Sequence, residues 1–234
     1  MNELTNKRLF LLDMDGTLYL DDRLFPGAAE FLAKIRQSGG KYLFLTNNSS
    51  KGVDAYVAKM TRLGVPAAPA DFLTSVDALI VFLERTYGAA VKKKKMYVVG
   101  TRSFCAQLAA AGFLLTETPD DDTEILILGF DRELTYRKLE DACRLLVRGG
   151  QKSDARQAKN ALPAVDYYAT NPDWVCPTAF GSVPDCGSMA WMLEKATGRL
   201  PKFIGKPEPE MALLAMAQCG CSAAETLLIG DRLY

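Results

Sequence analysis

The chain has 234 residues, of which 49% are hydrophobic and 24% are charged, a composition typical of a globular protein with a sizeable core. Lys and Arg together number 28, and so do Asp and Glu, so the sequence lacks the basic excess expected of a nucleic-acid-binding protein. No apolar run approaches the ~20 residues needed to span a bilayer. We therefore expect neither a nucleic-acid partner nor a membrane partner.

The contents of histidine and cysteine restrict the chemistry further. The sequence contains no histidine, which excludes Ser-His and Cys-His catalysis and any zinc site built on histidine. Any catalysis must use carboxylates, lysines, hydroxyl groups or a hard metal ion. The six cysteines are scattered without a Cys-x-x-Cys pair, and the N-terminus has no apolar signal-peptide core. These features predict a reduced, cytoplasmic location.

The N-terminal part of the chain alternates short apolar runs with stretches whose apolar residues recur at helical spacing. This pattern predicts a strand, a helix, a strand and a helix at 9–12, 28–35, 42–45 and 53–63. The first strand ends at Asp13 and the second at Thr46.

The same rhythm continues through the rest of the chain. In the middle part, helices and strands are predicted at 76–87, 96–100, 103–111, 125–129, 135–148 and 167–170. The C-terminal part adds elements at 187–197, 203–206, 208–219 and 227–231. The polar segment 151–160 interrupts the rhythm, and we interpret it as a mobile loop in preference to a partner-binding element.

Repeated strand-helix units predict an α/β fold with a doubly wound, largely parallel, Rossmann-like core and an inserted α/β cap domain. The predicted core comprises residues 1–78 and 185–234, and the predicted cap comprises residues 79–184. The middle part offers few carboxylates or lysines directly at its strand ends. We therefore expect the cap to act as a lid over a site in the core.

Four polar side chains follow strand ends in the core segments, namely Asp13, Thr46, Lys206 and Asp231. Open parallel sheets bind ligands in the crevice outside the carboxyl ends of their strands. We therefore expect these four residues to share one crevice.

The segment Asp13-Met14-Asp15-Gly16-Thr17 has the residues that phosphoryl transfer to a carboxylate requires. Asp13 can attack phosphorus to form an aspartyl-phosphate, and Asp15 can protonate the leaving oxygen and later activate water. Gly16 permits the tight turn that brings both carboxylates toward one phosphate. On its own, however, Asp15-Gly16 is equally consistent with an ordinary turn.

The other strand ends supply positive charge and hydrogen-bond donors. A carboxylate that attacks a phosphate dianion needs a cation between them, and Mg²⁺ bound by Asp13 and Asp231 would supply it. Thr46 and Asn47 can donate to phosphate oxygens, and Lys206 can neutralise the transferring group. Taken singly, Thr46-Asn47 also fits a cap region and Lys206 a loop charge, but together and in this order they favour a phosphate site.

With these motifs the sequence resembles the haloacid dehalogenase (HAD) superfamily, and within it the NagD-like, 4-nitrophenylphosphatase group (subclass IIA). The resemblance covers nearly the whole chain and rests on four ordered motifs, Asp13-Met14-Asp15-Gly16-Thr17-Leu18-Tyr19, Thr46-Asn47-Asn48-Ser49-Ser50, Gly205-Lys206-Pro207 and Gly230-Asp231-Arg232-Leu233-Tyr234. The segments Ala169-Thr170-Asn171-Pro172-Asp173 and Pro184-Asp185-Cys186-Gly187-Ser188 strengthen it.

The resemblance implies a role for each matched residue. Asp13 would be the nucleophile and a metal ligand, and Asp15 the acid/base, with its backbone carbonyl also on the metal. Asp231 would be the remaining protein ligand of Mg²⁺. The phosphate-binding residues would be Thr46, Asn47 and Lys206.

The resemblance also implies that the cap selects the substrate. It would place Asn171 and Asp173 at the mouth of the crevice, together with Asp131 and Arg132. For Asn171, a role as a capping or turn residue is an equally good interpretation.

The sequence departs from the family pattern in two places. The family continues past the last motif with a further acidic residue and at least one more strand and helix, whereas this sequence ends at Tyr234, so we expect the C-terminal part of the core to be incomplete. The polar segment 151–160 stands where relatives pass from helix to strand more directly.

These observations favour a Mg²⁺-dependent phosphomonoester hydrolase that acts through an aspartyl-phosphate on a small phosphorylated metabolite. Sugar phosphates, nucleoside monophosphates and pyridoxal phosphate all stay open as substrates, and 4-nitrophenyl phosphate is the test substrate. The alternatives are a non-catalytic phospholigand-binding module and a phosphotransferase that uses the same residues. A homodimer through the cap is an expectation by analogy alone.

Overall fold

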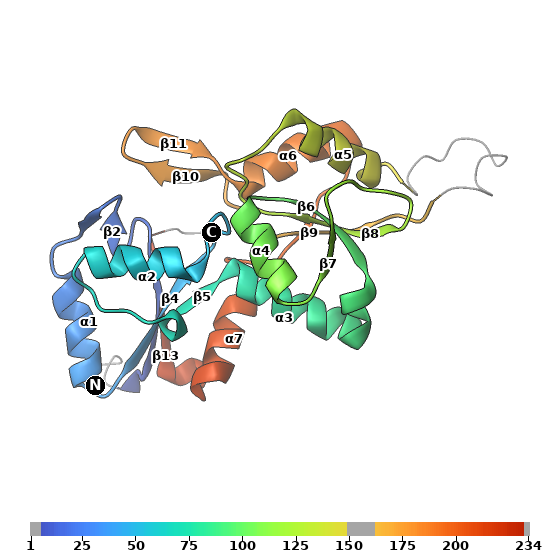
Figure 1. Cartoon of the computed structure of the whole chain (residues 1–234). Coiled ribbons are helices and arrows are strands. Elements are labelled where there is room, and N and C mark those ends of the chain that lie inside the picture. The colour runs from blue at the N-terminus through green and yellow to red at the C-terminus, as the bar shows by residue number, and fades with distance from the viewer. Residues whose placement is uncertain (1–5, 149–161, 232–234) are drawn as a thin grey trace.

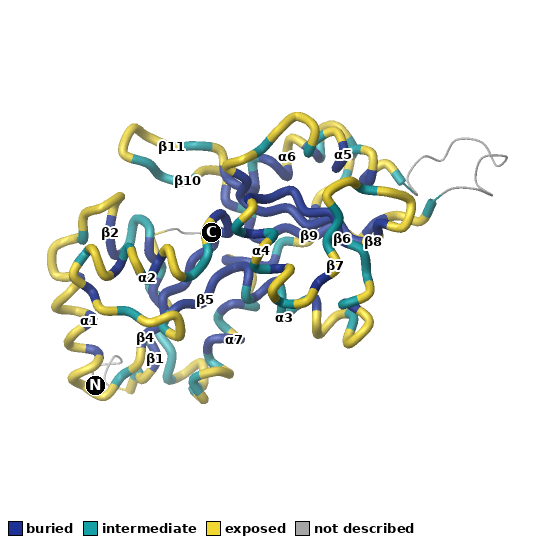
Figure 2. Tube along the Cα trace, in the orientation of Figure 1, coloured by how far each residue is buried: buried dark blue, intermediate teal, exposed yellow. Residues whose placement is uncertain are grey.

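The computed structural model describes residues 6–148 and 162–231 (Figure 1). The predicted segment 151–160 and the residues after Asp231 therefore lie outside the described residues. Two parallel sheets organise the chain, one of four strands and one of five. Figure 2 shows that the central strands of both sheets run through the buried interior, while most of the edge strands are partly exposed.

The four-stranded sheet has the order β13-β1-β4-β5 and is parallel throughout. Its strands are β1 (Leu9–Asp13), β4 (Lys41–Thr46), β5 (Phe72–Thr74) and β13 (Thr226–Ile229). Successive residues of β1 alternate between the two faces, so that Leu9 and Leu11 join one core cluster and Leu12 joins another. Each face of the sheet is therefore apolar and must be covered by helices.

Helices cover both faces of this sheet. α1 (Ala28–Gln37) and α2 (Val53–Arg62) pack on one face, while α7 (Glu210–Cys219) and α3 (Ser75–Tyr87) pack on the other. The buried residues of α1 are Ala28, Leu32 and Ile35, which share one helical stripe. This arrangement is the doubly wound core that the sequence predicts.

The five-stranded sheet has the order β12-β9-β8-β6-β7 and is also parallel. Its strands are β6 (Lys95–Val99), β7 (Leu114–Thr116), β8 (Thr123–Leu128), β9 (Asp166–Ala169) and β12 (Lys202–Phe203). α3 and α4 (Arg102–Ala110) cover one face, and α5 (Tyr136–Leu146) and α6 (Cys186–Thr197) cover the other. α3 contacts both α7 and α4, so it joins the two units.

Two hairpins and three short 3₁₀ helices complete the described structure. The hairpins are β2-β3 (Tyr19–Leu20, Arg23–Leu24) and β10-β11 (Val175–Thr178, Gly181–Pro184). The 3₁₀ helices are η2 (Pro69–Asp71), η3 (Gly88–Lys93) and η5 (Ala223–Glu225). Figure 1 shows the β10-β11 hairpin extending from the five-stranded unit toward the side of β2.

One strand lies in a different sheet from the one that the sequence suggested. The apolar pair before Lys206 was expected to belong to the core, but β12 pairs with β9 in the five-stranded sheet. The reason is that Ile204 and Gly205 continue this pairing by donating their backbone N–H groups to the carbonyls of Ala169 and Thr170. The predicted boundaries at 79 and 184 stay predictions.

Candidate active site

The carboxyl ends of β1 and β4 place Asp13 beside Thr46, because the two strands are parallel neighbours in which Asp13 pairs with Leu45. The Asp13 carboxylate accepts a hydrogen bond from the backbone N–H of Met14 at 2.8 Å. Its Oδ1 lies 2.7 Å from Nζ of Lys206, and the two side chains are 17% and 10% exposed. This ion pair is therefore partly open to solvent at the strand ends.

The turn after Asp13 requires a glycine at Gly16. Gly16 has φ of +87°, and a Cβ atom there would come within 2.4 Å of Oδ2 of Asp231. The Thr17 hydroxyl donates to Oδ1 of Asp231 at 3.4 Å. Asp231 lies two residues beyond β13. Because Gly16 has no side chain, the Asp231 carboxylate can pack against the turn that follows Asp13 and contains Asp15.

Asp15 has an environment that favours its protonated form. Burial raises the pKa of its carboxyl group, and the nearby charge of Asp13 raises it further, whereas the Lys59 ammonium acts in the opposite direction. Nζ of Lys59 lies 3.7 Å from Oδ1 of Asp15. A raised pKa lets a carboxyl group keep its proton to a higher pH, which suits a general acid.

Thr46 is buried at the end of β4, and the loop after it is folded by its own polar side chains. The Thr46 hydroxyl accepts from the backbone N–H of Asn48 at 3.2 Å. Asn48 in turn accepts from the backbone and the hydroxyl of Ser50 through its Oδ1. The Tyr56 hydroxyl donates to the Asn48 carbonyl at 3.0 Å, which ties the loop to α2.

The side chain of Asn47 is used within the protein, contrary to its expected use as a phosphate donor. Its Nδ2 donates to Oδ2 of Asp173 at 3.0 Å and to the Lys206 carbonyl at 2.9 Å. Its Oδ1 accepts from the backbone N–H of Lys206 at 2.9 Å. Both amide hydrogens are thus committed, so the Asn47 side chain joins the segment of Lys206 to the end of β4.

A cavity of about 30 Å³ lies where these groups meet. Residues from three parts of the chain line it, namely Asp13, Asp15, Thr46, Asn47, Asn48, Asp173, Cys176, Pro177, Asp185 and Lys206. Cys176 and Pro177 belong to β10, so the β10-β11 hairpin forms part of the cavity wall. Neither residue stands out in the sequence, because a proline in a four-residue strand carries no recognisable signal.

The two predicted cap residues nearest the site have different positions. Asp173 lines the cavity and accepts from Asn47. Asn171 is fully buried, donates to the Asn47 carbonyl at 2.8 Å and accepts from the Asp173 backbone N–H at 3.0 Å. Asn171 therefore supports the turn, which is the alternative interpretation made from the sequence.

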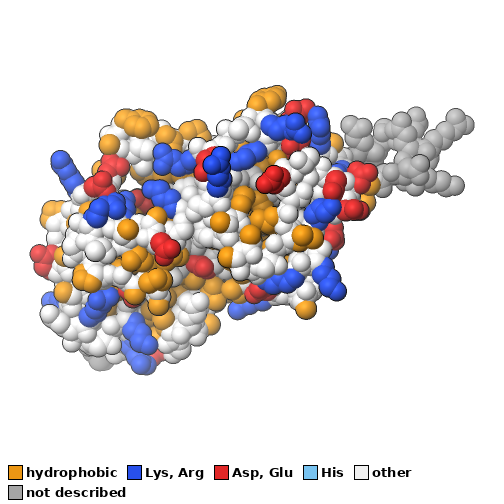
Figure 3. Space-filling view, in the orientation of Figure 1, with side chains coloured by type: hydrophobic (Ala, Val, Ile, Leu, Met, Phe, Trp, Pro, Cys, Tyr) orange, Lys and Arg blue, Asp and Glu red, His pale blue; other side chains and the backbone are white. Residues whose placement is uncertain are grey.

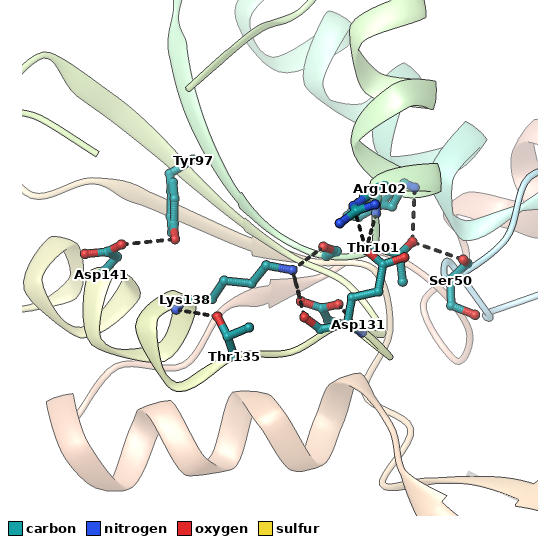
Figure 4. Close-up of polar contacts among 11 residues, drawn as sticks. Ser50, Tyr97, Thr101, Arg102, Asp131, Thr135, Lys138 and Asp141 are labelled. Carbon is teal, nitrogen blue, oxygen red and sulfur yellow. Dashed lines mark hydrogen bonds and ion pairs between the residues drawn. The ribbon is translucent and has the colours of Figure 1, made fainter. Parts of the chain in front are cut away.

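Asp131 and Arg132 lie outside this cavity, although the resemblance placed them at its mouth. Figure 4 shows the Asp131 carboxylate enclosed by its contacts with Lys138, whose Nζ lies 2.7 Å away. The other carboxylate oxygen accepts from the backbone N–H of Glu133 at 2.8 Å. Arg132 is exposed and lines a separate apolar cavity beside α6.

Asp13, Asp15 and Asp231 offer a set of donors suited to a hard cation, because all are oxygen ligands. Two glycines allow these carboxylates to come close to the backbone, since a Cβ at Gly16 would meet Oδ2 of Asp231 and a Cβ at Gly230 would lie 3.5 Å from Cβ of Asp13. In residues 6–148 and 162–231, however, no three His, Cys, Asp or Glu side chains already converge into a metal site. The fit to Mg²⁺ thus rests on the chemistry of the oxygen donors.

The charges on the surface and the lengths of the helices are relevant to the nucleic-acid and membrane partners considered from the sequence. On the face shown in Figure 3, Lys and Arg side chains are interspersed with Asp and Glu. Within the described part of the chain, the helices are all too short or too polar to cross a membrane.

Comparisons with known proteins agree with this site. The family described as haloacid dehalogenase-like hydrolase matches residues 10–114, and a HAD-hydrolase-like family matches residues 203–234. A dihydroxyacetone phosphatase of Corynebacterium glutamicum is 31% identical over 224 residues, which cover 96% of this chain and 74% of that protein.

Solved structures show the same likeness. The 4-nitrophenylphosphatase of Thermotoga maritima is 34% identical with a TM-score of 0.86, and the match covers all of this chain and 82% of that one. A glycerol phosphate phosphatase of Mycobacterium tuberculosis, solved in complex with magnesium, is 28% identical with a TM-score of 0.80, and the match covers 98% and 64% of the two chains.

The fold and the site thus define an α/β hydrolase of the HAD type. The chain belongs to the haloacid dehalogenase-like hydrolases, and its likeness is to their NagD and 4-nitrophenylphosphatase members. The predicted family, fold class and enzyme class, a phosphatase of this family, are confirmed.

Proposed function

We propose that the protein is a Mg²⁺-dependent phosphomonoester hydrolase in which Asp13 is the nucleophile and Asp15 the general acid and base. The observation that carries the proposal is the partly exposed Asp13-Lys206 pair in one cavity with Asp15 and Thr46. A nucleophilic carboxylate must be reachable by the substrate, and a cation beside it must be able to meet the phosphate.

Each residue has a defined part in the first step. The Asp13 carboxylate forms a bond to phosphorus while the bond from phosphorus to the leaving oxygen breaks, and Asp15 gives its proton to that oxygen. The Lys206 ammonium offsets the negative charge of the phosphoryl oxygens, and the Thr46 hydroxyl donates a hydrogen bond to one of them. The product is an aspartyl-phosphate on Asp13.

The second step returns the enzyme to its starting state. Asp15, now a carboxylate, takes a proton from water as that water attacks phosphorus and the bond to Asp13 breaks. Asp13, Asp231 and the backbone carbonyl of Asp15 would hold Mg²⁺. When bound, the ion supplies positive charge that offsets the repulsion between the Asp13 carboxylate and the phosphate dianion.

Small sugar phosphates and related polyol phosphates are the substrate class that the comparisons support best. The similar proteins are named dihydroxyacetone phosphatase, acid sugar phosphatase and glycerol phosphate phosphatase. The cavity of about 30 Å³ is far smaller than the roughly 300 Å³ of a small-molecule pocket, so most of such a substrate would lie outside it. Nucleoside monophosphates and pyridoxal phosphate remain the competing substrates.

A screen of small phosphate esters with and without Mg²⁺ tests this function. The panel contains triose and hexose phosphates, glycerol phosphate, nucleoside monophosphates, pyridoxal phosphate and 4-nitrophenyl phosphate. We expect Mg²⁺-dependent phosphate release, and none from Asp13→Asn at equal folded protein. Retained turnover in Asp13→Asn would remove Asp13 as the nucleophile. Ligand-induced thermal stabilisation without any phosphate release would instead favour a non-catalytic binding module.

We also propose a cytoplasmic location for the protein. All six cysteines are free thiols, as a reducing compartment would keep them. A homodimer through the cap stays a prediction.

A further inference from the structure

Lys59 lies behind the cavity and does not line it. It stands in the second half of α2 (Val53–Arg62), and its side chain is 19% exposed. Its Nζ lies 3.7 Å from Oδ1 of Asp15 and 3.7 Å from the centre of the Tyr19 ring. The ammonium group therefore stands between an aromatic face and the proposed acid/base.

The Tyr19 ring is a fixed platform for this ammonium group. Tyr19 is fully buried, and its backbone closes the turn that carries Asp15, because its carbonyl accepts from the Gly16 N–H at 2.9 Å and its N–H donates to the Met14 carbonyl. Its hydroxyl makes no hydrogen bond to any residue that the structure describes. What the ring offers Lys59 is its π face, which attracts a cation most strongly where water is excluded.

We propose that Lys59 is a positioning residue for the reaction, and that its ammonium group, seated on Tyr19, holds the Asp15 carboxyl group toward the leaving oxygen. The Tyr19 ring fixes the ammonium from one side, so its approach to Oδ1 can restrict the rotation of the Asp15 side chain while the other oxygen, Oδ2, carries the proton. The inference rests on the proposed function, because it assumes that Asp15 gives its proton to the leaving group.

The step in question is the breaking of the bond between phosphorus and the leaving oxygen. A sugar or glycerol alkoxide is a poor leaving group and must receive the Asp15 proton as this bond breaks. 4-Nitrophenolate is stable as an anion and leaves without that proton. Misplacement of Asp15 should therefore slow the first step with alkyl phosphates far more than with 4-nitrophenyl phosphate.

The test compares the first-turnover release of the two kinds of leaving group, with enzyme in excess over substrate. For Lys59→Met, we expect release from glycerol phosphate or a triose phosphate to slow by about 10- to 100-fold. Release of 4-nitrophenolate should change by less than about threefold, and KM should be nearly unchanged, since Lys59 does not touch the phosphate. Lys59→Arg should restore most of the lost rate, because the guanidinium keeps the charge and the stacking on Tyr19.

Two further variants provide controls. Arg62→Met removes a cation three residues farther along α2. This cation is 65% exposed and, among the described residues, its ion pair is with exposed Asp22 alone, so the change should leave both rates unchanged. Tyr19→Phe keeps the aromatic face and removes a hydroxyl that has no partner among the described residues, so it should retain the preference of the wild type between leaving groups.

Two results would overturn the inference. Equal slowing with both leaving groups in Lys59→Met would indicate general damage to the site, and unchanged rates would show that Asp15 needs no such support. In either case the proposed function would stand as long as Asp13→Asn is inactive. If Asp13→Asn is active, the proposed function itself fails, whatever Lys59→Met does.

Discussion

Two carboxylate-lysine pairs lie near the carboxyl ends of parallel strands. Asp13, the last residue of β1, pairs with Lys206, which follows β12 of the other sheet, and Asp131, which follows β8, pairs with Lys138. The distance from Nζ to the carboxylate oxygen is 2.7 Å in both. The Asp13 side chain is 17% exposed, whereas that of Asp131 is 0% exposed. The lysines show the reverse order, with Lys138 25% exposed and Lys206 10% exposed. The two pairs thus have the same ionic contact, and the feature that sets the cap pair apart is its fully enclosed carboxylate.

The two lysines also differ in the hydrogen bonds that their ammonium groups make within the protein. Besides Asp131, Lys138 donates to the carbonyls of Gly100 at 2.8 Å and Glu133 at 3.3 Å, so its three hydrogens are all used (Figure 4). In the described part of the chain, the Lys206 ammonium makes one further hydrogen bond, to the Leu45 carbonyl at 3.4 Å. Because the donors of Lys138 are all used within the protein, its pair supports the structure. Lys206 keeps donor capacity toward the cavity, so its pair can bind a ligand.

The largest expected effect is the loss of the cation that faces the cavity. Lys206→Met should lower the turnover of 4-nitrophenyl phosphate by about 10²- to 10³-fold, because a charge that meets the transferring phosphoryl group is removed. Steady-state kinetics measure this loss, and urea unfolding checks that the fold is kept. Turnover within tenfold of the wild type would mean that this pair is as structural as the one in the cap.

The next effect concerns stability and leaves turnover intact. Asp131→Asn should lower the free energy of unfolding by about 3 kcal/mol, because the Lys138 ammonium is left without its buried counter-charge. Urea unfolding measures the change, and turnover should stay within about twofold of the wild type.

A double variant sharpens this second prediction. Replacement of both partners, Asp131→Leu with Lys138→Met, should cost less than the sum of the two single changes, since no buried charge is then unpaired. A large loss of turnover in folded Asp131→Asn would return Asp131 to the substrate site that the sequence suggested for it.

The third effect is on the turn between Asp13 and Asp231. Gly16→Ala should destabilise the protein by about 1–2 kcal/mol, because φ of +87° is strained for alanine and its Cβ would press on the Asp231 carboxylate. The Mg²⁺ concentration needed for half-maximal activity should rise, because the Asp231 carboxylate is displaced. Titration of activity with Mg²⁺ measures this shift, and an unchanged titration would argue against Asp231 as a ligand.

The smallest effect comes from a carboxylate on the surface, Glu225. Its hydrogen bonds from the Ser222 backbone and hydroxyl, with help from Arg8, lower its pKa from 4.5 to about 2. A lowered pKa stabilises the fold above the unfolded value and loses this contribution as pH falls from about 4.5 toward 2. Glu225→Gln should therefore lower the Tm slightly at pH 7, and the difference from the wild type should shrink on acidification. A difference that is independent of pH would contradict the charge-based explanation.

Much of the core site could be predicted from the sequence because parallel strands end at one edge of a sheet. This rule brings Asp13 and Thr46 together without any knowledge of loops. The long helices were also predictable, since ten or more residues display the 3.6-residue period. Strands of three residues, such as β5 (Phe72–Thr74) and β7 (Leu114–Thr116), are too short to show a period.

Apart from Asp173, the cap side of the site could not be predicted, because it depends on tertiary contacts. Asp131 follows a strand end, as Asp13 does, and only its contact with Lys138 on α5 shows that it is enclosed. The side chain of Asn47 is likewise committed by Asp173 and Lys206, which are 126 and 159 residues away along the chain. Cys176 reaches the cavity through a hairpin whose sequence has no alternating pattern.

The most direct test is to identify the residue that carries the phosphoryl group during turnover. The enzyme is mixed with a radiolabelled small phosphate ester and Mg²⁺, quenched with acid within the first turnover, and mapped by peptide analysis. We predict that the label lies on the peptide that contains Asp13 and that it disappears in Asp13→Asn. Phosphate release without a labelled enzyme, or a label on any other residue, would contradict the assignment of Asp13 as the nucleophile.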